Sequence, residues 1–171
     1  AGLNEKVDIK FLDYRDLKGK YDSIASIEMI EAVGEKYLDK YFSTIKENLK
    51  QGGIGAIQSI IIKDELFERY RKNEDFIQKY IFPGGFLPSL HSIKDHCKKS
   101  GLELTGYNSY GSHYSNTLKE WRGNFAESWN DISKQGFDLS FKKIWNFYFS
   151  YCEAGFKSKN IDLIQFSLSN K

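Results

Sequence analysis

The sequence predicts an α/β fold built on an open, mostly parallel sheet. Three kinds of observation indicate this class: runs of β-branched residues typical of strands, a stretch with apolar residues at helical spacing, and short polar or glycine-containing turns between them. In the first half of the chain these segments follow in the order strand, strand, helix, strand. A helix between two strands of one sheet is the βαβ arrangement, so those two strands should run parallel.

Two short strands are expected before the first long helix. Val7, Ile9 and Phe11 recur with a period of two, which gives residues 7–12 one strongly apolar face. After a polar turn, residues 21–27 read as a second and more buried strand. Ligands of open α/β sheets bind outside the carboxyl ends of the strands, so the residues that follow each strand are the first candidates for a site.

The next segment combines a helix with a central strand. Residues 35–50 carry apolar side chains at helical spacing, and Gly52-Gly53 is expected to end this helix as a C-terminal glycine does. Residues 54–62 are a β-branched run long enough for a strand in the middle of the sheet. The apolar helix positions are Leu38, Tyr41, Phe42, Ile45 and Leu49.

The second half of the chain is richer in helices. Large apolar side chains recur there at helical spacing, and the last helix is aromatic almost all round, which is typical of a helix that is buried between layers or lines an apolar pocket. The expected order is helix 64–81, helix 90–100 ending at Gly101, strand 102–110, a helical stripe over 118–132, helix 140–157 and strand 161–168.

The composition limits the possible functions. The formal net charge of +2 leaves no concentrated basic face, which argues against a nucleic-acid partner. Cys97 and Cys152 form no C-x-x-C pair, which suits a reducing cytoplasm. No apolar run approaches the roughly 20 residues of a membrane span. No two of the histidines have metal-ligand spacing, so no metal site is expected.

Several segments carry a family resemblance. They are DYRDL (13–17), SIEMIEAVG (26–34), NLKQGGIGAIQSI (48–60), YIFPGGFLPSL (80–90), HYSNTLKEW (113–121) and IWNFYFSYCEAGF (144–156). In this order and combination they resemble the cyclopropane-fatty-acyl-phospholipid synthases and the related mycolic acid cyclopropane synthases. The matches cover essentially the whole chain, and the proline-glycine segment is the most distinctive of them.

The resemblance implies the Rossmann-like, doubly wound sheet of S-adenosylmethionine-dependent methyltransferases, with an antiparallel last strand and helical insertions. The family's glycine-rich loop, which cradles the methionine end of the cofactor, has no match here, because Gly52-Gly53 does not follow a first strand. Residues 1–171 are therefore expected to be one partial methyltransferase domain, a C-terminal fragment that is inactive alone. A sheet without its first two strands exposes an edge, which favours a homo-oligomer.

The implied reaction adds a methylene group to the cis double bond of a phospholipid acyl chain. The double bond attacks the methyl group of S-adenosylmethionine, and the carbocation loses a proton to a bicarbonate ion as a cyclopropane closes. Such an enzyme would work from the cytoplasm, with peripheral contact to the inner membrane surface. Two alternatives stay open: a methyltransferase of the same fold that acts on another lipid or small molecule, and a non-catalytic lipid-binding domain.

For catalysis the resemblance singles out residues that hold bicarbonate in the family. Glu31 matches the glutamate that helps to hold the ion, although a glutamate at the start of a helix is also favourable in itself. Gln58 stands where many relatives carry a bicarbonate-binding histidine, and Ile60 supplies only its backbone. The hydroxyl of Tyr114 binds the same ion, and its ring face stabilises the cation. Cys152 matches a candidate active-site cysteine, although methyl transfer to an alkene needs no covalent enzyme intermediate.

Further residues are assigned to the cofactor and the acyl chain. Asp13, Tyr14 and Arg15 match the strand end that contacts the adenine side of the cofactor. Glu28 competes with Glu31 for the acidic role, and structural support of Glu31 is its expected function. Candidates for the acyl-chain pocket are Phe82, Gly84, Gly85, Phe86, Trp145 and Tyr148, the last two being equally consistent with core packing.

Overall fold

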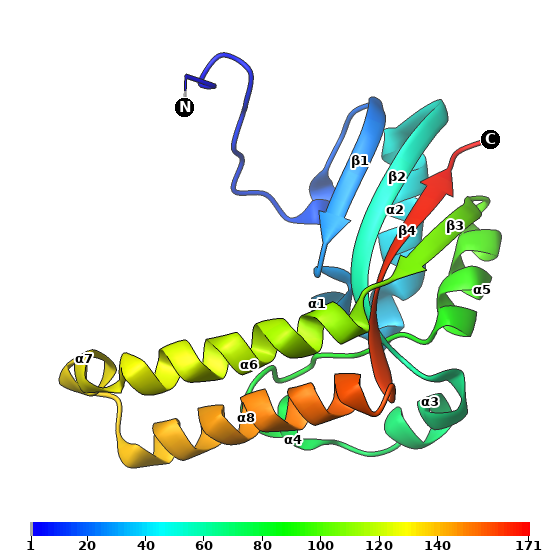
Figure 1. The fold of residues 1–171 in the computed structure, drawn as a ribbon. Helices are drawn as coiled ribbons and strands as arrows, with labels where there is room; N and C mark the ends of the chain where they lie inside the picture. Colours follow the sequence, from blue (N-terminus) through cyan, green and yellow to red (C-terminus); the bar gives the residue numbers. More distant parts are fainter. Residues whose placement is uncertain (1) are drawn as a thin grey trace.

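The computed structural model describes residues 2–171, which form a mixed sheet of 4 strands in the order β1-β2-β4-β3 (Figure 1). The strands are β1 (Tyr21–Ile27), β2 (Leu49–Ile62), β3 (Glu103–Ser109) and β4 (Ile161–Ser169). β1 and β2 are parallel, as the βαβ order predicts, and β4 is antiparallel to both of its neighbours. The predicted α/β class and the antiparallel last strand are therefore confirmed.

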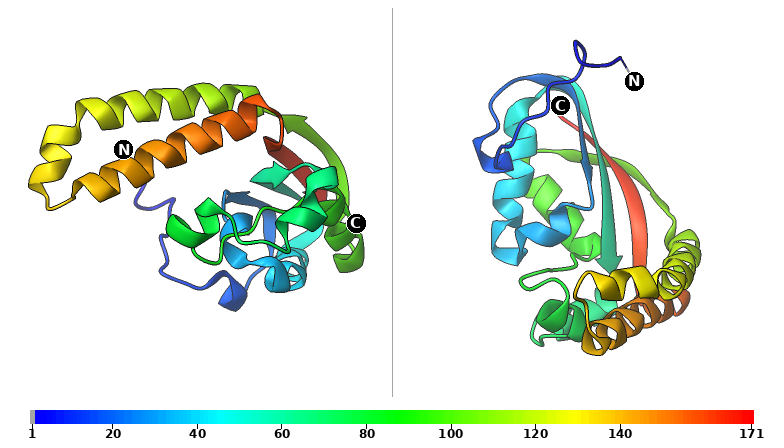
Figure 2. Two further views of the ribbon diagram at one scale, coloured as in Figure 1. Left: turned by 90° about the horizontal axis from the view of Figure 1, so that it is seen from below. Right: turned by 90° about the vertical axis from the view of Figure 1, so that its left-hand side faces the viewer.

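The helices lie in two groups. α2 and α5 pack on one face of the sheet, whereas α6 and α8 form a long hairpin that extends away from it, with α7 at the tip (Figures 1 and 2). The helices are α1 (Ile30–Val33), α2 (Leu38–Asn48), α3 (Asp64–Tyr70), α4 (Phe76–Tyr80), α5 (Leu90–Ser100), α6 (Gly111–Glu127), α7 (Trp129–Lys134) and α8 (Leu139–Lys157), with 3-10 turns at η1 (Tyr14–Asp16) and η2 (Glu35–Tyr37).

The main core lies between the sheet and the α2–α5 layer. α2 buries the apolar stripe that its spacing predicts, and Leu38 and Phe42 are almost completely shielded from solvent. Tyr41 is also buried and donates a hydrogen bond of 2.9 Å to the hydroxyl of Ser26 on β1. A buried phenol needs such a partner, and this one ties the helix to the strand before it.

A second core holds the hairpin to the sheet. Leu118 of α6, Phe149 and Phe156 of α8 and Leu163 of β4 form its buried centre, and further aromatic side chains pack around them. Aromatic residues of the last helix face in more than one direction: Phe149 packs against Phe125 of α6, whereas Phe147 packs against Phe76 of α4. This core fixes α6 above the carboxyl end of β1.

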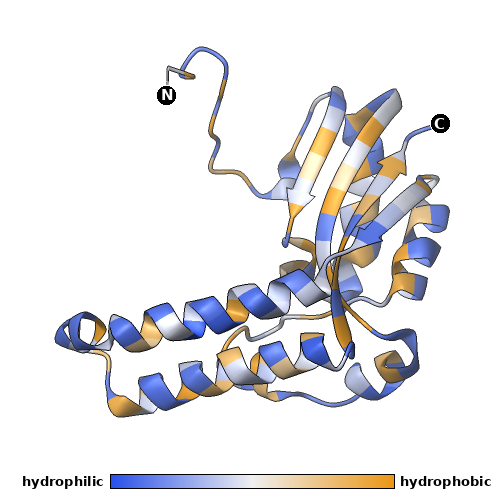
Figure 3. Cartoon of the chain, viewed as in Figure 1, coloured by the Kyte–Doolittle hydropathy of each residue, from blue (hydrophilic) through white to orange (hydrophobic). Residues whose placement is uncertain are grey.

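The opposite face of the sheet is uncovered by the described residues. Ala25, Ala56 and Ser167 lie side by side across β1, β2 and β4 and are exposed. Ile54, two residues before Ala56 on the same face, keeps 56% of its surface exposed. Figure 3 shows how the strands collect apolar residues while the outer surface of the hairpin is mostly hydrophilic. The face is flat, because small side chains line it.

The predicted strand at residues 7–12 is wrong. This segment has no regular structure, and Ile9 and Phe11 are almost fully exposed. A strand is stable only when its backbone pairs with a neighbour, and none of the described strands lies beside this segment. Apolar and polar side chains do alternate in residues 7–12, but this segment pairs with no strand of the described sheet.

The predicted end of the α2 helix is also wrong. α2 ends at Asn48, and β2 begins at Leu49, so Gly52 and Gly53 belong to the strand rather than to a helix cap. A Cβ atom on Gly53 would lie 2.9 Å from the carbonyl oxygen of Lys50. The glycine is needed because two backbone segments approach closely here, which is the other common reason for glycine in a strand.

The helix predicted over residues 64–81 is divided into α3 and α4. Asp75 begins α4 with a capping box, in which its carboxylate accepts the backbone N–H of Gln78 and the Gln78 side chain accepts the N–H of Asp75. This capping box starts α4 as a helix separate from α3. In contrast, α5 ends at Gly101 in the left-handed conformation that the glycine predicted.

Candidate active site

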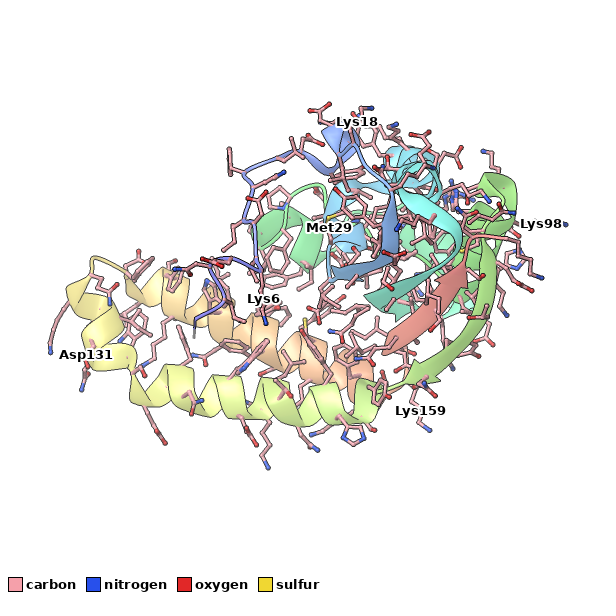
Figure 4. The ribbon with its side chains drawn as sticks, turned by 90° about the horizontal axis from the view of Figure 1, so that it is seen from above. Lys6, Lys18, Met29, Lys98, Asp131 and Lys159 are labelled. Atoms are coloured by element: carbon pink, nitrogen blue, oxygen red, sulfur yellow. The ribbon has the colours of Figure 1, made fainter. Side chains whose placement is uncertain are left out.

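The candidate site lies where β1 ends and the chain turns into α1. Glu28 follows the last residue of β1. Its backbone has a φ of 49°, which residues other than glycine rarely adopt. Its N–H donates to the carbonyl oxygen of Gln58 on β2 at 2.9 Å, so the turn is tied to the neighbouring strand. Figure 4 labels Met29, the next residue, whose partly buried side chain packs against the main core. This is the sheet edge at which open α/β folds bind ligands.

The carboxylate of Glu28 is the centre of a hydrogen-bond network. The side-chain amide of Gln58 donates to one of its oxygens at 2.7 Å, and the hydroxyl of Tyr114 donates to the other at 3.1 Å. Behind them, the amide of Gln165 on β4 donates to the side-chain carbonyl of Gln58 at 2.8 Å. The structure thus brings together two predicted residues, Gln58 and Tyr114, around a carboxylate to which the sequence assigned only support.

Glu31 lies one turn further, in α1. One of its carboxylate oxygens accepts the backbone N–H of Ile60 at 2.5 Å, and the other is buried without a hydrogen-bond partner. Burial raises the pKa of Glu31, and the negative charge of Glu28 raises it further. Glu28 therefore does not support Glu31 through a hydrogen bond. Instead the two carboxyl groups repel each other, and the site has a surplus of negative potential.

Tyr114 reaches the network from α6. Burial and the charge of Glu28 raise the pKa of its phenol, so the hydroxyl stays protonated and acts as a donor. The ring packs 4.9 Å from the Phe156 ring and 6.0 Å from the Trp121 ring, measured between centroids. Aromatic neighbours on α6 and α8 hold the phenol in place, and its π-face adds to a surface that favours a cation.

The predicted adenine-side residues form the 3-10 turn η1. The Arg15 guanidinium donates to both oxygens of Asp13, at 2.9 and 2.6 Å, and these hydrogen bonds lower the pKa of that carboxyl to about 2. Tyr14 packs edge-on against Tyr41 of α2, with ring centroids 6.0 Å apart. The turn thus holds a permanent carboxylate and a half-buried aromatic ring, but no hydrogen bond links it to the Glu28 network among residues 2–171.

The proline-glycine turn between α4 and α5 is attached to the site. Phe86 donates its N–H to the carbonyl oxygen of Glu31 at 2.9 Å. Gly84 has a φ of 81°, and a Cβ on Gly85 would lie 2.9 Å from the carbonyl oxygen of Phe82, so the turn needs both glycines. The Phe86 side chain, however, is 5% exposed and packs in the main core rather than lining an open pocket.

Aromatic side chains continue from this turn onto α8. Phe82 is 53% exposed, and its ring meets Tyr148 edge-on with centroids 6.1 Å apart. Tyr148 in turn contacts Trp145 at 5.3 Å, and burial raises the Tyr148 pKa to about 12. Trp145 and Tyr148 pack against the second core, as Tyr114 does, and Phe82 extends this row of rings towards solvent.

Cys152 lies on α8 in the same core. Burial raises the pKa of its thiol to about 12, so it is protonated near neutral pH. The thiolate is the nucleophilic form of cysteine, and this environment disfavours it. The structure places Cys152 near the aromatic surface but gives it no activating base.

Two larger features of the described residues bear on function. Across residues 2–171, no three His, Cys, Asp or Glu side chains are grouped as ligands of a metal ion. No helix of this part of the chain is both long enough and apolar enough to cross a membrane.

Sequence comparison identifies the family. Residues 1–166 match the family described as mycolic acid cyclopropane synthetase. The chain belongs to this family. Two relatives of the cyclopropane synthetase family bear out the match: the chain is 40% identical to the tuberculostearic acid methyltransferase UfaA1 of Mycobacterium tuberculosis over 98% of its length, and 34% identical to the cyclopropane-fatty-acyl-phospholipid synthase of Escherichia coli over 94%. It spans 40% and 41% of these two proteins.

Solved structures of cyclopropane synthetase family members share the fold. The mycolic acid cyclopropane synthase CmaA1 complexed with SAH and CTAB superimposes on 91% of the chain with a TM-score of 0.80 and 26% identity, and the match covers 57% of that protein. The cyclopropane synthase MmaA2 from Mycobacterium tuberculosis gives a TM-score of 0.82 over 96% of the chain and 62% of its own length, at 22% identity. The predicted methyltransferase fold is therefore confirmed.

Sequence reasoning missed Gln165 and ranked Glu28 below Glu31 for the acidic role. A signal for Gln165 was present, because it is the single glutamine of β4, as Gln58 is in the apolar second half of β2. Only the register, which pairs Gln58 with Gln165 directly, shows that the two amides meet. For Glu28 the missing information was the distance to Tyr114, which is 86 positions away in the chain.

Proposed function

We propose that this chain forms the lipid-facing part of the active site of an S-adenosylmethionine-dependent methyltransferase that acts on cis-unsaturated acyl chains of phospholipids. The observation that carries the proposal is the Glu28 carboxylate, hydrogen-bonded to Gln58 and Tyr114 at the carboxyl end of β1 and next to buried Glu31. Membership of a family of lipid methyltransferases supports it. Contact with the bilayer is peripheral and from the cytoplasmic side.

The site suits a reaction that passes through positive charge. S-adenosylmethionine supplies an electrophilic methyl group on a sulfonium, and attack by a double bond leaves a carbocation on the acyl chain. The two carboxyl groups and the Tyr114 ring face stabilise positive charge beside the apolar surface of Phe82 and Tyr148. Asp13 and Tyr14 fit the outer wall of a site for the adenosine group, because one is a permanent hydrogen-bond acceptor and the other an aromatic ring.

A separate bicarbonate ion does not fit the arrangement of the donors. Gln58 and Tyr114, which the resemblance assigned to that ion, both donate to Glu28. The Ile60 N–H donates to Glu31. Each donor is thus already paired with a carboxylate of the protein. No step is therefore derived through bicarbonate.

We infer that Glu28 itself is the base. The π-electrons of the double bond form the new carbon–carbon bond to the methyl group, and the sulfur keeps the pair of the bond that breaks. The carbocation then loses a proton to the Glu28 carboxylate. If the proton leaves the new methyl group and its electron pair bonds to the cationic carbon, a cyclopropane closes. Gln58 and Tyr114 keep the carboxylate oriented towards that proton.

A second product is favoured by one comparison. The relative that is 40% identical is described as a tuberculostearic acid methyltransferase rather than as a cyclopropane synthase. If the cation instead loses a proton from a chain carbon beside it, the electron pair forms a double bond and the product is a methyl-branched alkene. For a methylene-branched alkene, a hydride first moves from the methylated carbon to the cationic carbon, and the new methyl group then loses the proton. Atoms and charges balance in each case, and Glu28 is the base in each.

The test is a lipid assay with matched variants. The chain is joined to the part of the 40% identical relative that the match leaves uncovered, and is given S-adenosylmethionine and vesicles of cis-unsaturated phospholipid. Mass spectrometry should find acyl chains one methylene heavier, and mild hydrogenation separates a ring from a branched alkene. Glu28→Gln should lower the rate by about 10²- to 10⁴-fold, as expected when a general base is removed. The exposed Glu65→Gln is the control.

Adding bicarbonate to the assay tests whether Glu28 or a bicarbonate ion accepts the proton. Glu28→Gly opens the space between Gln58 and Tyr114, so bicarbonate should restore part of its activity but leave the unsubstituted protein unaffected. An unsubstituted protein that requires bicarbonate, together with an active Glu28→Gln variant, would contradict the role of Glu28. Unchanged lipids with a folded, cofactor-binding protein would instead overturn the substrate class.

A further inference from the structure

Among the described residues, Gln165 lies next to the candidate site but makes no hydrogen bond with Glu28. It is on β4, directly opposite Gln58 in the antiparallel pair with β2, and both side chains project from the uncovered face of the sheet. Its amide nitrogen donates to the side-chain carbonyl of Gln58 at 2.8 Å. The position has no role in the reaction described so far.

The contact decides which end of the Gln58 amide faces Glu28. A glutamine side chain has an acceptor oxygen on one side and a donor nitrogen on the other. The oxygen of Gln58 is held by Gln165, and so its nitrogen points to Glu28, to which it donates at 2.7 Å. If the amide turned over, its oxygen would face the carboxylate, and an attractive contact would become a repulsive one.

We propose that Gln165 is a positioning residue, which acts through Gln58 to keep a donor on the Glu28 carboxylate. The proposal rests on the proposed function, in which Glu28 is the base. The carboxylate has two donors in the structure: Tyr114, whose ring is held by packing, and Gln58, whose amide is oriented by a hydrogen bond from Gln165. With both donors in place the carboxylate is held in one orientation, so Gln165 helps to keep Glu28 directed towards the proton that it accepts.

Two substitutions separate orientation from packing. Gln165→Leu removes the donor and leaves Gln58 free to turn. Gln165→Glu puts an acceptor in its place, so Gln58 turns its nitrogen to residue 165 and its oxygen to Glu28. The kcat should therefore fall by about 10-fold in the first variant and by up to about 100-fold in the second, at similar KM.

The control is Ser167→Ala, two residues further on the same strand and face, which should retain full activity. A double-mutant cycle then tests the route of the effect. In a Gln58→Leu background, Gln165→Leu should cost nothing further, because the residue acts only through Gln58. Equal losses in both backgrounds would show that Gln165 acts in another way and would overturn the proposal.

A second measurement does not depend on turnover. In a proton–nitrogen-15 correlation spectrum, the side-chain NH₂ signals of Gln58 should be shifted from the positions of a free glutamine and protected from exchange, and both effects should be lost in Gln165→Leu and persist in Ser167→Ala. Signals that are the same in all three proteins would contradict the proposal. If Gln165 variants show the NMR change but Glu28→Gln is fully active, the positioning holds and the base assignment fails. If the Gln165 variants behave like the unsubstituted protein but Glu28→Gln is inactive, the base assignment holds and the positioning role fails.

Discussion

The backbone at Glu28 is held in a conformation that few side chains tolerate. Its φ of 49° lies in the left-handed region, and such positions are concentrated where a structure needs a side chain in a particular place. The neighbouring contacts explain why it persists, because the N–H and both carboxylate oxygens of Glu28 are hydrogen-bonded. The conformation turns the carboxylate back towards β2 and α6.

The left-handed backbone of Glu28 predicts an unusual order of stability for two variants at this position. Glu28→Gly and Glu28→Ala both lose the carboxylate, but only glycine accepts the left-handed backbone freely. The glycine variant should therefore be more stable than the alanine variant by about 1 kcal/mol, measured by urea unfolding. At Ser23, in the extended backbone of β1, the same pair of substitutions should show the opposite order. Equal stabilities at Glu28 would mean that the turn relaxes.

Glu31 predicts a dependence of stability on pH. Burial raises its pKa, so the native state holds the proton more tightly than the unfolded chain. The stability linked to this group is fully present below the unfolded value, about pH 4.3, and is lost as the pH rises through the raised native value. Glu31→Gln keeps an acceptor for Ile60 but cannot ionise. This variant should therefore be more stable than the unsubstituted protein, and the difference should grow as the pH rises towards neutral.

Thermal unfolding followed between about pH 4 and pH 7.5 checks this expectation, since the range spans the titration of a glutamate with a raised pKa. The exposed Glu65→Gln should leave the profile unchanged. A constant difference between Glu31→Gln and the unsubstituted protein at every pH would show that Glu31 does not ionise in this interval.

What the sequence showed of the site depended on the resemblance. It placed Glu31, Gln58 and Tyr114 near one ion, and the structure brings the last two together. It ranked Glu31 above Glu28 without information on which donors each carboxylate reaches. That depends on the register of two strands and on the position of a helix far along the chain.

At the scale of elements, the start of α6 decides where Tyr114 lies. Asp162 on β4 accepts the N–H of Gly111 at 2.8 Å and the hydroxyl of Ser109 at 2.5 Å, which fixes the first turn of the helix to the sheet. A Cβ atom on Gly111 would collide with the Asp162 carboxylate and lie 3.2 Å from Phe156. Only glycine allows the helix to begin this close to β4.

Gly111→Ala should therefore destabilise the protein by about 1–3 kcal/mol, the usual cost of overpacking. Gly123→Ala, in the same helix but with no atom within 4 Å of the added Cβ, should stabilise it by about 0.5–1 kcal/mol. Chemical denaturation of both variants gives the comparison. A neutral Gly111→Ala would show that Asp162 moves aside without cost.

The elements that the sequence predicted well are those that local patterns determine. α5 is an example, because Ser89 caps its start and Gly101 ends it. The failures at residues 7–12 and at Gly52-Gly53 have a different origin. Strand pairing and the close approach of two backbones are decided by segments elsewhere in the chain, and no short pattern contains them.

The whole molecule exposes an unusual amount of sheet. β1 has a free edge, and the face that carries Ile27 and Ile54 is uncovered by the described residues, with 61% and 56% of these side chains exposed. Unpaired edges and apolar faces favour association with another chain. We therefore expect the 171-residue chain to form homo-oligomers.

Ile54→Lys should shift the sedimentation coefficient towards the monomer, because a charge on the contact face disfavours its burial. Leu139→Lys, at an equally exposed apolar position near the tip of the hairpin, should leave the distribution unchanged. A monodisperse monomer of the unsubstituted chain at all concentrations would contradict the expectation.

The order of strands in the sheet has a consequence for biosynthesis. β4 lies between β2 and β3, yet the ribosome produces it after both. Until residues 161–169 have emerged, β2 and β3 have no strand to join them, and Gln58 lacks its contact with Gln165. A nascent chain thus carries Glu28 throughout most of its translation without the network around it. Among the described strands, the last to be made is the one that completes the hydrogen-bond network around Glu28.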